Sequence, residues 1–82
     1  MITGKQDEAA VVDIEAWASR IARSAREGVQ VSVYYDGDSS TYVLRLARAN
    51  RVLLFRLSDQ QVRTPEREAE CEKTLRKKIN DL

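Results

Sequence analysis

Histidine is absent from the 82-residue chain, and there are only one cysteine, one proline and three glycines. The chain therefore lacks the side chain that acts most often as a general base and as a metal ligand. Its single thiol, Cys71, excludes an intramolecular disulfide and a cysteine-rich zinc site, in agreement with a reducing compartment. No glycine-rich phosphate-binding loop is present. We expect a non-catalytic protein with no cofactor and no metal site.

Long hydrophobic runs are also missing. The longest strongly apolar run covers residues 52–55, far short of the roughly 20 residues that a membrane-spanning helix requires. The first ten residues, MITGKQDEAA, lack the basic and apolar segments of a signal peptide. These features predict a cytoplasmic protein without a membrane partner.

The composition is typical of one small folded domain, residues 1–82. Hydrophobic residues make up 43% and charged residues 33% of the chain, so it is expected to fold. A core of this size is only marginally stabilising, and small domains often gain stability by dimerisation. We therefore expect the chain to self-associate.

The periodicity of apolar residues predicts an α+β fold with the element order α-β-β-β-α. Apolar residues at three- and four-residue spacing predict a helix from about Asp7 to Arg26, which Gly28 ends. Strict alternation predicts three strands, at residues 29–35, 41–48 and 51–58. Thr64 as N-cap and Pro65 at the first helical position predict the last helix.

The turns between the strands predict the register of a three-stranded antiparallel meander. A two-residue turn at Ala49 and Asn50 places Leu46 opposite Leu53. A four-residue loop at 37–40 places Val33 opposite Leu44 and Tyr35 opposite Tyr42 in the same way. We expect both helices to pack mainly on one face, which leaves the outer face of the sheet open.

Four arginines lie on the second and third strands, and no carboxylate lies between residues 41 and 58. Arg48 and Arg51 are expected to face each other at the hairpin tip, whereas Arg45 and Arg56 lie diagonally on the outer face. Directly opposed like charges cost roughly 0.2 to 1 kcal/mol unless an anion compensates them. One explanation is protection of the strands against aggregation, with the arginines directed toward glutamates of the last helix. These glutamates are Glu66, Glu68, Glu70 and Glu72.

The other explanation is a binding surface for carboxylates or phosphates, because guanidinium groups match both geometrically. Our first hypothesis is an interaction protein, a homodimer, that binds a protein partner through the outer face and the arginines. The predicted partner-binding residues are Tyr34, Val43, Arg45, Arg48, Arg51, Val52, Leu54 and Arg56. The alternative is a nucleic-acid-binding regulator in which the same arginines, with Arg20, Arg23 and the basic C-terminal turn, contact phosphates.

Dimerisation is expected through the outer face or through strand 29–35, which contains no charge and no proline and should lie at a sheet edge.

Two further sequence features, Cys71 and the segment DGDSST, have structural interpretations. Cys71 belongs to the apolar stripe of the last helix and is expected to be a core thiol. The segment DGDSST has a misplaced glycine and an alanine at the twelfth position of a calcium loop, and is expected to be a turn.

The element order also occurs in double-stranded RNA-binding domains. Here, however, the last helix opens with PEREAECE, and an acidic helix start repels phosphate. We therefore assign no family from the order of elements alone.

Overall fold

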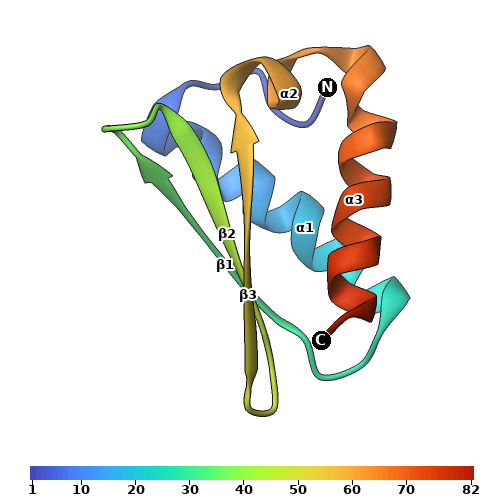
Figure 1. Ribbon diagram of the computed structural model, residues 1–82. Coiled ribbons are helices and arrows are strands. Elements are labelled where there is room, and N and C mark those ends of the chain that lie inside the picture. The colour runs from blue at the N-terminus through green and yellow to red at the C-terminus, as the bar shows by residue number, and fades with distance from the viewer.

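The computed structural model describes all 82 residues and confirms an α+β fold with helices before and after a three-stranded sheet. Figure 1 shows the arrangement. The elements, in chain order, are the 3-10 turn η1 (Asp7–Ala10), α1 (Val11–Ala25), β1 (Gln30–Asp36), β2 (Thr41–Arg48), β3 (Arg51–Ser58), α2 (Asp59–Arg63), the 3-10 turn η2 (Pro65–Arg67) and α3 (Glu68–Asn80). None of the helices is both long enough and apolar enough to cross a membrane.

The sheet is antiparallel with the strand order β1-β2-β3. The predicted register is confirmed, since Val33 lies opposite Leu44 and Leu46 lies opposite Leu53. Arg48 pairs with Arg51 and closes the two-residue turn between β2 and β3. Ala49 in this turn has a φ of 53°, a left-handed conformation that suits glycine better than alanine.

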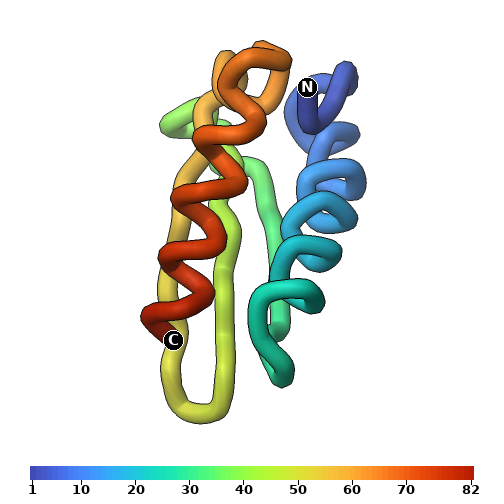
Figure 2. Tube along the Cα trace, turned by 90° about the vertical axis from the view of Figure 1, so that its right-hand side faces the viewer, coloured from blue at the N-terminus to red at the C-terminus, as the bar shows by residue number.

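One hydrophobic core lies between the sheet and the helices. It combines inward-facing residues of all three strands with an apolar stripe from α1 and one from α3. The α1 stripe includes Ile14 and Ile21, and the α3 stripe includes Cys71, Leu75 and Ile79. Both helices therefore pack on the same face, with α1 against β1 and α3 against β3 (Figures 1 and 2).

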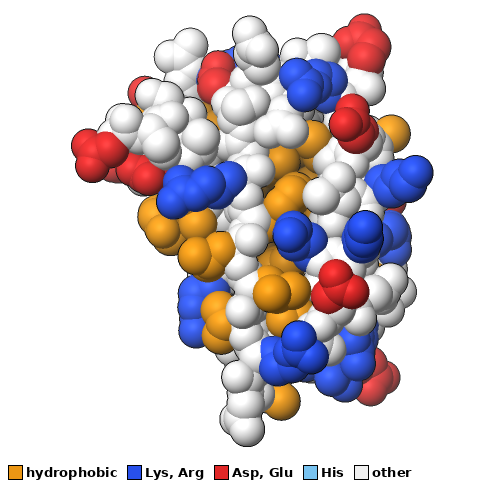
Figure 3. Space-filling view, in the orientation of Figure 1, with side chains coloured by type: hydrophobic (Ala, Val, Ile, Leu, Met, Phe, Trp, Pro, Cys, Tyr) orange, Lys and Arg blue, Asp and Glu red, His pale blue; other side chains and the backbone are white.

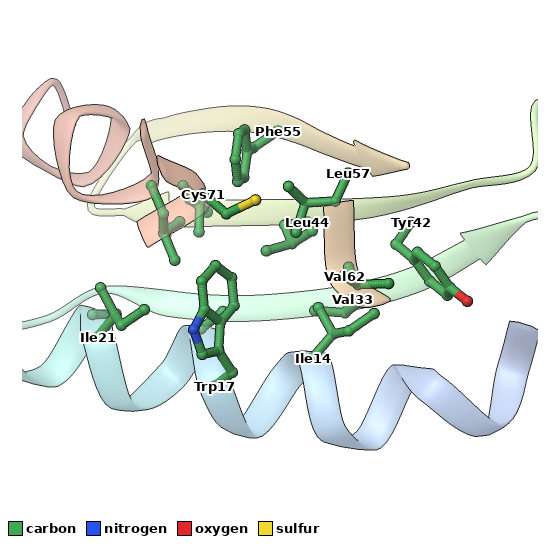
Figure 4. Packing of buried hydrophobic residues seen from close by; sticks show 14 of the residues in the cluster. Ile14, Trp17, Ile21, Val33, Tyr42, Leu44, Phe55, Leu57, Val62 and Cys71 are labelled. Atoms are coloured by element: carbon green, nitrogen blue, oxygen red, sulfur yellow. The ribbon is translucent and has the colours of Figure 1, made fainter. Parts of the chain in front are cut away.

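Trp17 extends from α1 toward the strands in the middle of this core (Figure 4). The side chain is 4% exposed, and its indole N–H has no hydrogen-bond partner. As the only tryptophan, Trp17 can report on the integrity of the core by its fluorescence.

The short helix α2 was not predicted. It begins with a capping box: the Ser58 hydroxyl accepts a hydrogen bond from the Gln61 N–H at 3.2 Å, and Gln61 Oε1 accepts one from the Ser58 N–H at 2.8 Å. Val62 is fully buried, and its carbonyl accepts hydrogen bonds from the N–H groups of Ile2 and Thr3. α2 thus holds the N-terminus of the chain.

The last helix begins differently from the prediction. Pro65 does occupy the first position, but the opening turn is the 3-10 turn η2, and the Thr64 side chain makes no capping hydrogen bond. Regular α-helix begins only at Glu68.

Candidate functional site

The outer face is the side of the sheet opposite the helices, and neither helix covers it. The whole chain has five exposed large hydrophobic residues, and three of them lie here: Tyr34 at 52%, Val52 at 47% and Leu54 at 55% exposure. Hydrophobic side chains gather to the left of β3 in Figure 3, next to basic ones. An exposed apolar surface with charged residues beside it is typical of an interaction site.

Val43 also belongs to the outer face but is fully buried. Val43 pairs with Tyr34 on β1 and with Arg56 on β3, so a larger side chain flanks it on each side. The prediction that Val43 is a contact residue is therefore wrong, and Val43 supports Tyr34 instead.

Arg56 is bound within the molecule. Its Nη1 lies 3.2 Å from Asp36 Oδ2 and donates a hydrogen bond to Thr41 Oγ1 at 3.0 Å. A hydrogen bond from the Ser39 side chain, and secondly the one from Arg56, hold the pKa of Asp36 below its usual value. This cluster ties the end of β3 to the loop between β1 and β2.

Arg45 is the charged residue of the outer face that has no partner. It lies between Ser32 on β1 and Leu54 on β3, is exposed, and takes part in no hydrogen bond or ion pair. The single acid among the outer-face positions, Asp36, is paired with Arg56. Arg45 thus places a free guanidinium group beside exposed apolar side chains.

Arg48 and Arg51 do not join this surface. Their side chains alternate with those of the outer face and lie on the helix side of the hairpin tip. Arg48 Nε donates to the Glu27 carbonyl at 3.1 Å, which connects the tip to the end of α1. The hairpin arginines therefore form two separate groups.

The second group belongs to one end of the molecule, where the hairpin tip and the ends of α1 and α3 lie close together (Figure 1). Arg26 Nη1 donates to the Leu82 carbonyl at 2.7 Å and joins the two helix ends. We call this region the basic end; its basic residues are Arg23, Arg26, Arg48, Arg51, Lys77 and Lys78, and the acidic residues Glu27 and Asp81 lie at the same two helix ends. Its composition could not be read from spacing in the sequence, because α1, β2, β3 and α3 all contribute to it.

The proposed pairing of hairpin arginines with glutamates of the last helix is wrong. Glu68 lies 3.2 Å from the N-terminal ammonium group, and Glu72 lies 3.0 Å from Arg76 Nε. The second of these pairs is an i,i+4 contact along α3. None of the hydrogen bonds or ion pairs of the hairpin arginines involves α3.

Two other features are a buried thiol and a surface depression. Cys71 is 3% exposed, and burial raises the pKa of its thiol, so the neutral form predominates. A depression of about 280 Å³ lies between Tyr35, Ser40 and Arg63, but the Arg63 guanidinium is already bound by Asp59 and by the Lys5 carbonyl. No group of three histidine, cysteine, aspartate or glutamate side chains is arranged to hold a metal ion.

No family of proteins, no curated protein and no solved structure matches this chain.

Proposed function

We propose that the chain is a small non-catalytic interaction protein that binds a protein partner through the outer face. The observation that carries this proposal is the position of Arg45. A free guanidinium group lies next to exposed Leu54 on a sheet face that no helix covers. Arginine and aromatic residues are the types most enriched at the energetic centres of interfaces, and Tyr34 completes the set.

The side chains of the outer face also indicate which kind of partner segment they would bind. Arg45 can bind a carboxylate with two parallel hydrogen bonds, while Tyr34, Val52 and Leu54 provide apolar contacts around it. We expect a segment with an acidic side chain flanked by apolar ones. A partner with a basic binding surface is disfavoured, because the outer face has no unpaired carboxylate to receive it.

The proposal is tested by capturing partners on the immobilised protein and on two charge-reversed variants. Arg45→Glu changes the outer face, whereas Arg20→Glu makes the same charge change at an exposed position of α1. We expect a partner that the wild type and Arg20→Glu retain and that Arg45→Glu binds at least about tenfold more weakly, since charge-paired interface arginines are commonly worth 2 kcal/mol or more. Titration calorimetry with the purified partner gives the affinities.

Equal affinity of all three proteins for each captured partner would remove Arg45 from the binding site. A second outer-face variant, Tyr34→Ser, separates the contribution of the apolar contact to binding from that of the Arg45 charge. If neither Arg45→Glu nor Tyr34→Ser weakens binding, the outer face is not the interaction surface.

Binding of nucleic acid by the basic end is the second candidate function. The observation in its favour is the convergence of Arg48 and Arg51 with the C-terminal ends of two helices, through the contacts of Arg48 and Arg26. Phosphate contacts by such groups make affinity depend steeply on salt. The net charge of only +1 weighs against this candidate.

Fluorescence anisotropy with labelled duplex RNA, duplex DNA and single-stranded DNA, at low and physiological salt, separates the two candidates. Phosphate binding by the basic end predicts that Arg48→Gln and Arg51→Gln each reduce the salt slope by about one contact. Arg45→Gln should leave that slope unchanged. Absence of binding even at low salt would leave the protein-binding proposal alone.

A further inference from the structure

The outer edge of β3 is open. In a hairpin closed by a two-residue turn, the closing pair, here Arg48 and Arg51, exchanges both hydrogen bonds. Odd-numbered residues of β3 therefore bond to β2, and the N–H and C=O groups of Val52, Leu54 and Arg56 are directed away from the sheet. None of the backbone–backbone hydrogen bonds outside the helices and strands involves the N–H or C=O groups of these three residues.

Hydrophobic side chains lie on both sides of this edge. Val52 and Leu54 are exposed on the outer face, and Leu53 remains partly exposed on the helix side. In Figure 3 the backbone of β3 faces the viewer, with hydrophobic side chains to its left and in the seam toward α3. From Val52 to Phe55 the strand contains no charge and no proline, the usual protections of an edge.

The other edge of the sheet is less accessible. α1 packs against β1 and lies beyond this strand at its edge of the sheet, whereas α3 lies over β3 (Figure 2). A strand approaching β1 would meet α1. The structure thus favours β3 over strand 29–35 as the pairing edge.

β3 is complementary to itself when the two-fold axis passes through Leu54. Val52 then pairs with Arg56 of the partner subunit, and each hydrogen-bonded pair exchanges two hydrogen bonds. No arginine faces another arginine in this register. With the axis at Arg56, the two Arg56 guanidinium groups would face each other. With the axis at Phe55, the backbone N–H of Ser58 would have to bond to the partner strand, but this group already donates to Gln61 Oε1.

We propose that two copies of this chain associate through antiparallel pairing of β3 with β3, centred on Leu54, and form one continuous six-stranded sheet. The outer faces of both copies then form a single surface with Leu54 of each subunit at its centre and the two Arg45 side chains on either side. This inference rests on the edge and its register, and it does not depend on the proposed function.

Sedimentation equilibrium tests the association. The wild type is expected to have twice the chain mass of 9.4 kDa. Leu54→Lys places two ammonium groups opposite each other at the axis and removes the apolar contact, so dimerisation should weaken at least about tenfold. Gln30→Lys adds the same charge to the outer face on β1, far from the axis, and should remain dimeric.

Disulfide trapping tests the register. Leu54→Cys brings two thiols together at the axis, with Cα atoms about 5.5 Å apart, a distance that a disulfide spans. The matched variant Val52→Cys places its two thiols four residues out of register, about 13 Å apart along the strand, and should not cross-link. The native Cys71 is buried in both proteins.

A wild type that remains monomeric at millimolar concentration would overturn the proposal. So would a dimer that Leu54→Lys leaves intact, or one in which Val52→Cys cross-links as readily as Leu54→Cys. These outcomes are separate from those of the proposed function, because a monomer that binds its partner through Arg45 would contradict the dimer only. If the dimer centred on Leu54 forms but substitution of Arg45 does not weaken partner binding, only the proposed function is contradicted.

Discussion

Arg45 and Arg56 lie on neighbouring strands of the outer face, yet only Arg56 has partners. The difference arises from position along the strands. Arg56 can reach Asp36 and Thr41, at the end of the sheet where the loop between β1 and β2 begins, whereas Arg45 lies between Ser32 and Leu54. The alternation of the sequence predicted that both face outward, but it contained no information on the conformation of the loop that supplies the carboxylate.

The Asp36 cluster predicts a measurable titration. Ser39→Ala should raise the pKa of Asp36 toward its ordinary value of 3.8, and Arg56→Gln should raise it by less, because the Ser39 hydrogen bond is the larger cause of the depression. Carbon-detected NMR of the Asp36 carboxyl carbon measures both shifts. Ser32→Ala, a serine on the same face and away from the cluster, should change nothing.

The sign of the pH effect follows from the same shift. Because the pKa of Asp36 is lower in the folded than in the unfolded chain, ionised Asp36 stabilises the fold above the ordinary value of 3.8. That contribution is lost as the pH falls through the lower, folded pKa. An Asp36 pKa that Ser39→Ala and Arg56→Gln leave unchanged would show that neither side chain holds the carboxylate in solution.

At the scale of elements, the turn at Ala49 and Asn50 is under local strain. A left-handed residue other than glycine costs about 1 to 2 kcal/mol, and the greater flexibility of glycine in the unfolded chain offsets about 0.5 to 1 kcal/mol. Ala49→Gly should therefore stabilise the protein by about 0.5 to 1 kcal/mol in urea unfolding followed by Trp17 fluorescence. Ala47→Gly, inside β2, should destabilise it, and a loss of stability in both variants would contradict the strained turn.

The helix α2 provides a second prediction at this scale. Ser58→Ala removes the hydroxyl that caps the Gln61 N–H and should cost about 1 kcal/mol. Ser58→Asp keeps an acceptor at the same position and should retain most of the stability. Equal losses in both variants, measured by urea unfolding, would show that the hydroxyl does not act as a cap.

The elements also show which parts of the fold the sequence could predict. β2 and β3 were predicted with their observed bounds, because alternation and a two-residue turn together determine the register. α2 has only five residues, too few to show helical periodicity, and Ser58 ends the alternating pattern of β3. The signal that could have revealed α2 is the spacing of Ser58 and Gln61, which matches a capping box.

At the scale of the whole molecule, the hairpin arginines divide between two surfaces. Arg45 and Arg56 belong to the outer face, and Arg48 and Arg51 belong to the basic end. The sequence predicted this division in part, because alternation places successive residues of each strand on opposite faces of the sheet. It could not predict the basic end, since the contact of Arg48 with the end of α1 depends on how the helix packs on the sheet.

The proposed dimer predicts that the stability of the whole molecule depends on its concentration. If β3 pairs with β3, unfolding releases two chains, and a tenfold rise in protein concentration should stabilise the dimer by about 1.4 kcal/mol. Trp17 is buried, so its fluorescence follows the transition in urea. The wild-type midpoint should rise with concentration, and that of Leu54→Lys should not. A wild-type midpoint that is independent of concentration would show that each chain reaches its full stability alone, and that pairing through β3 contributes nothing to the fold.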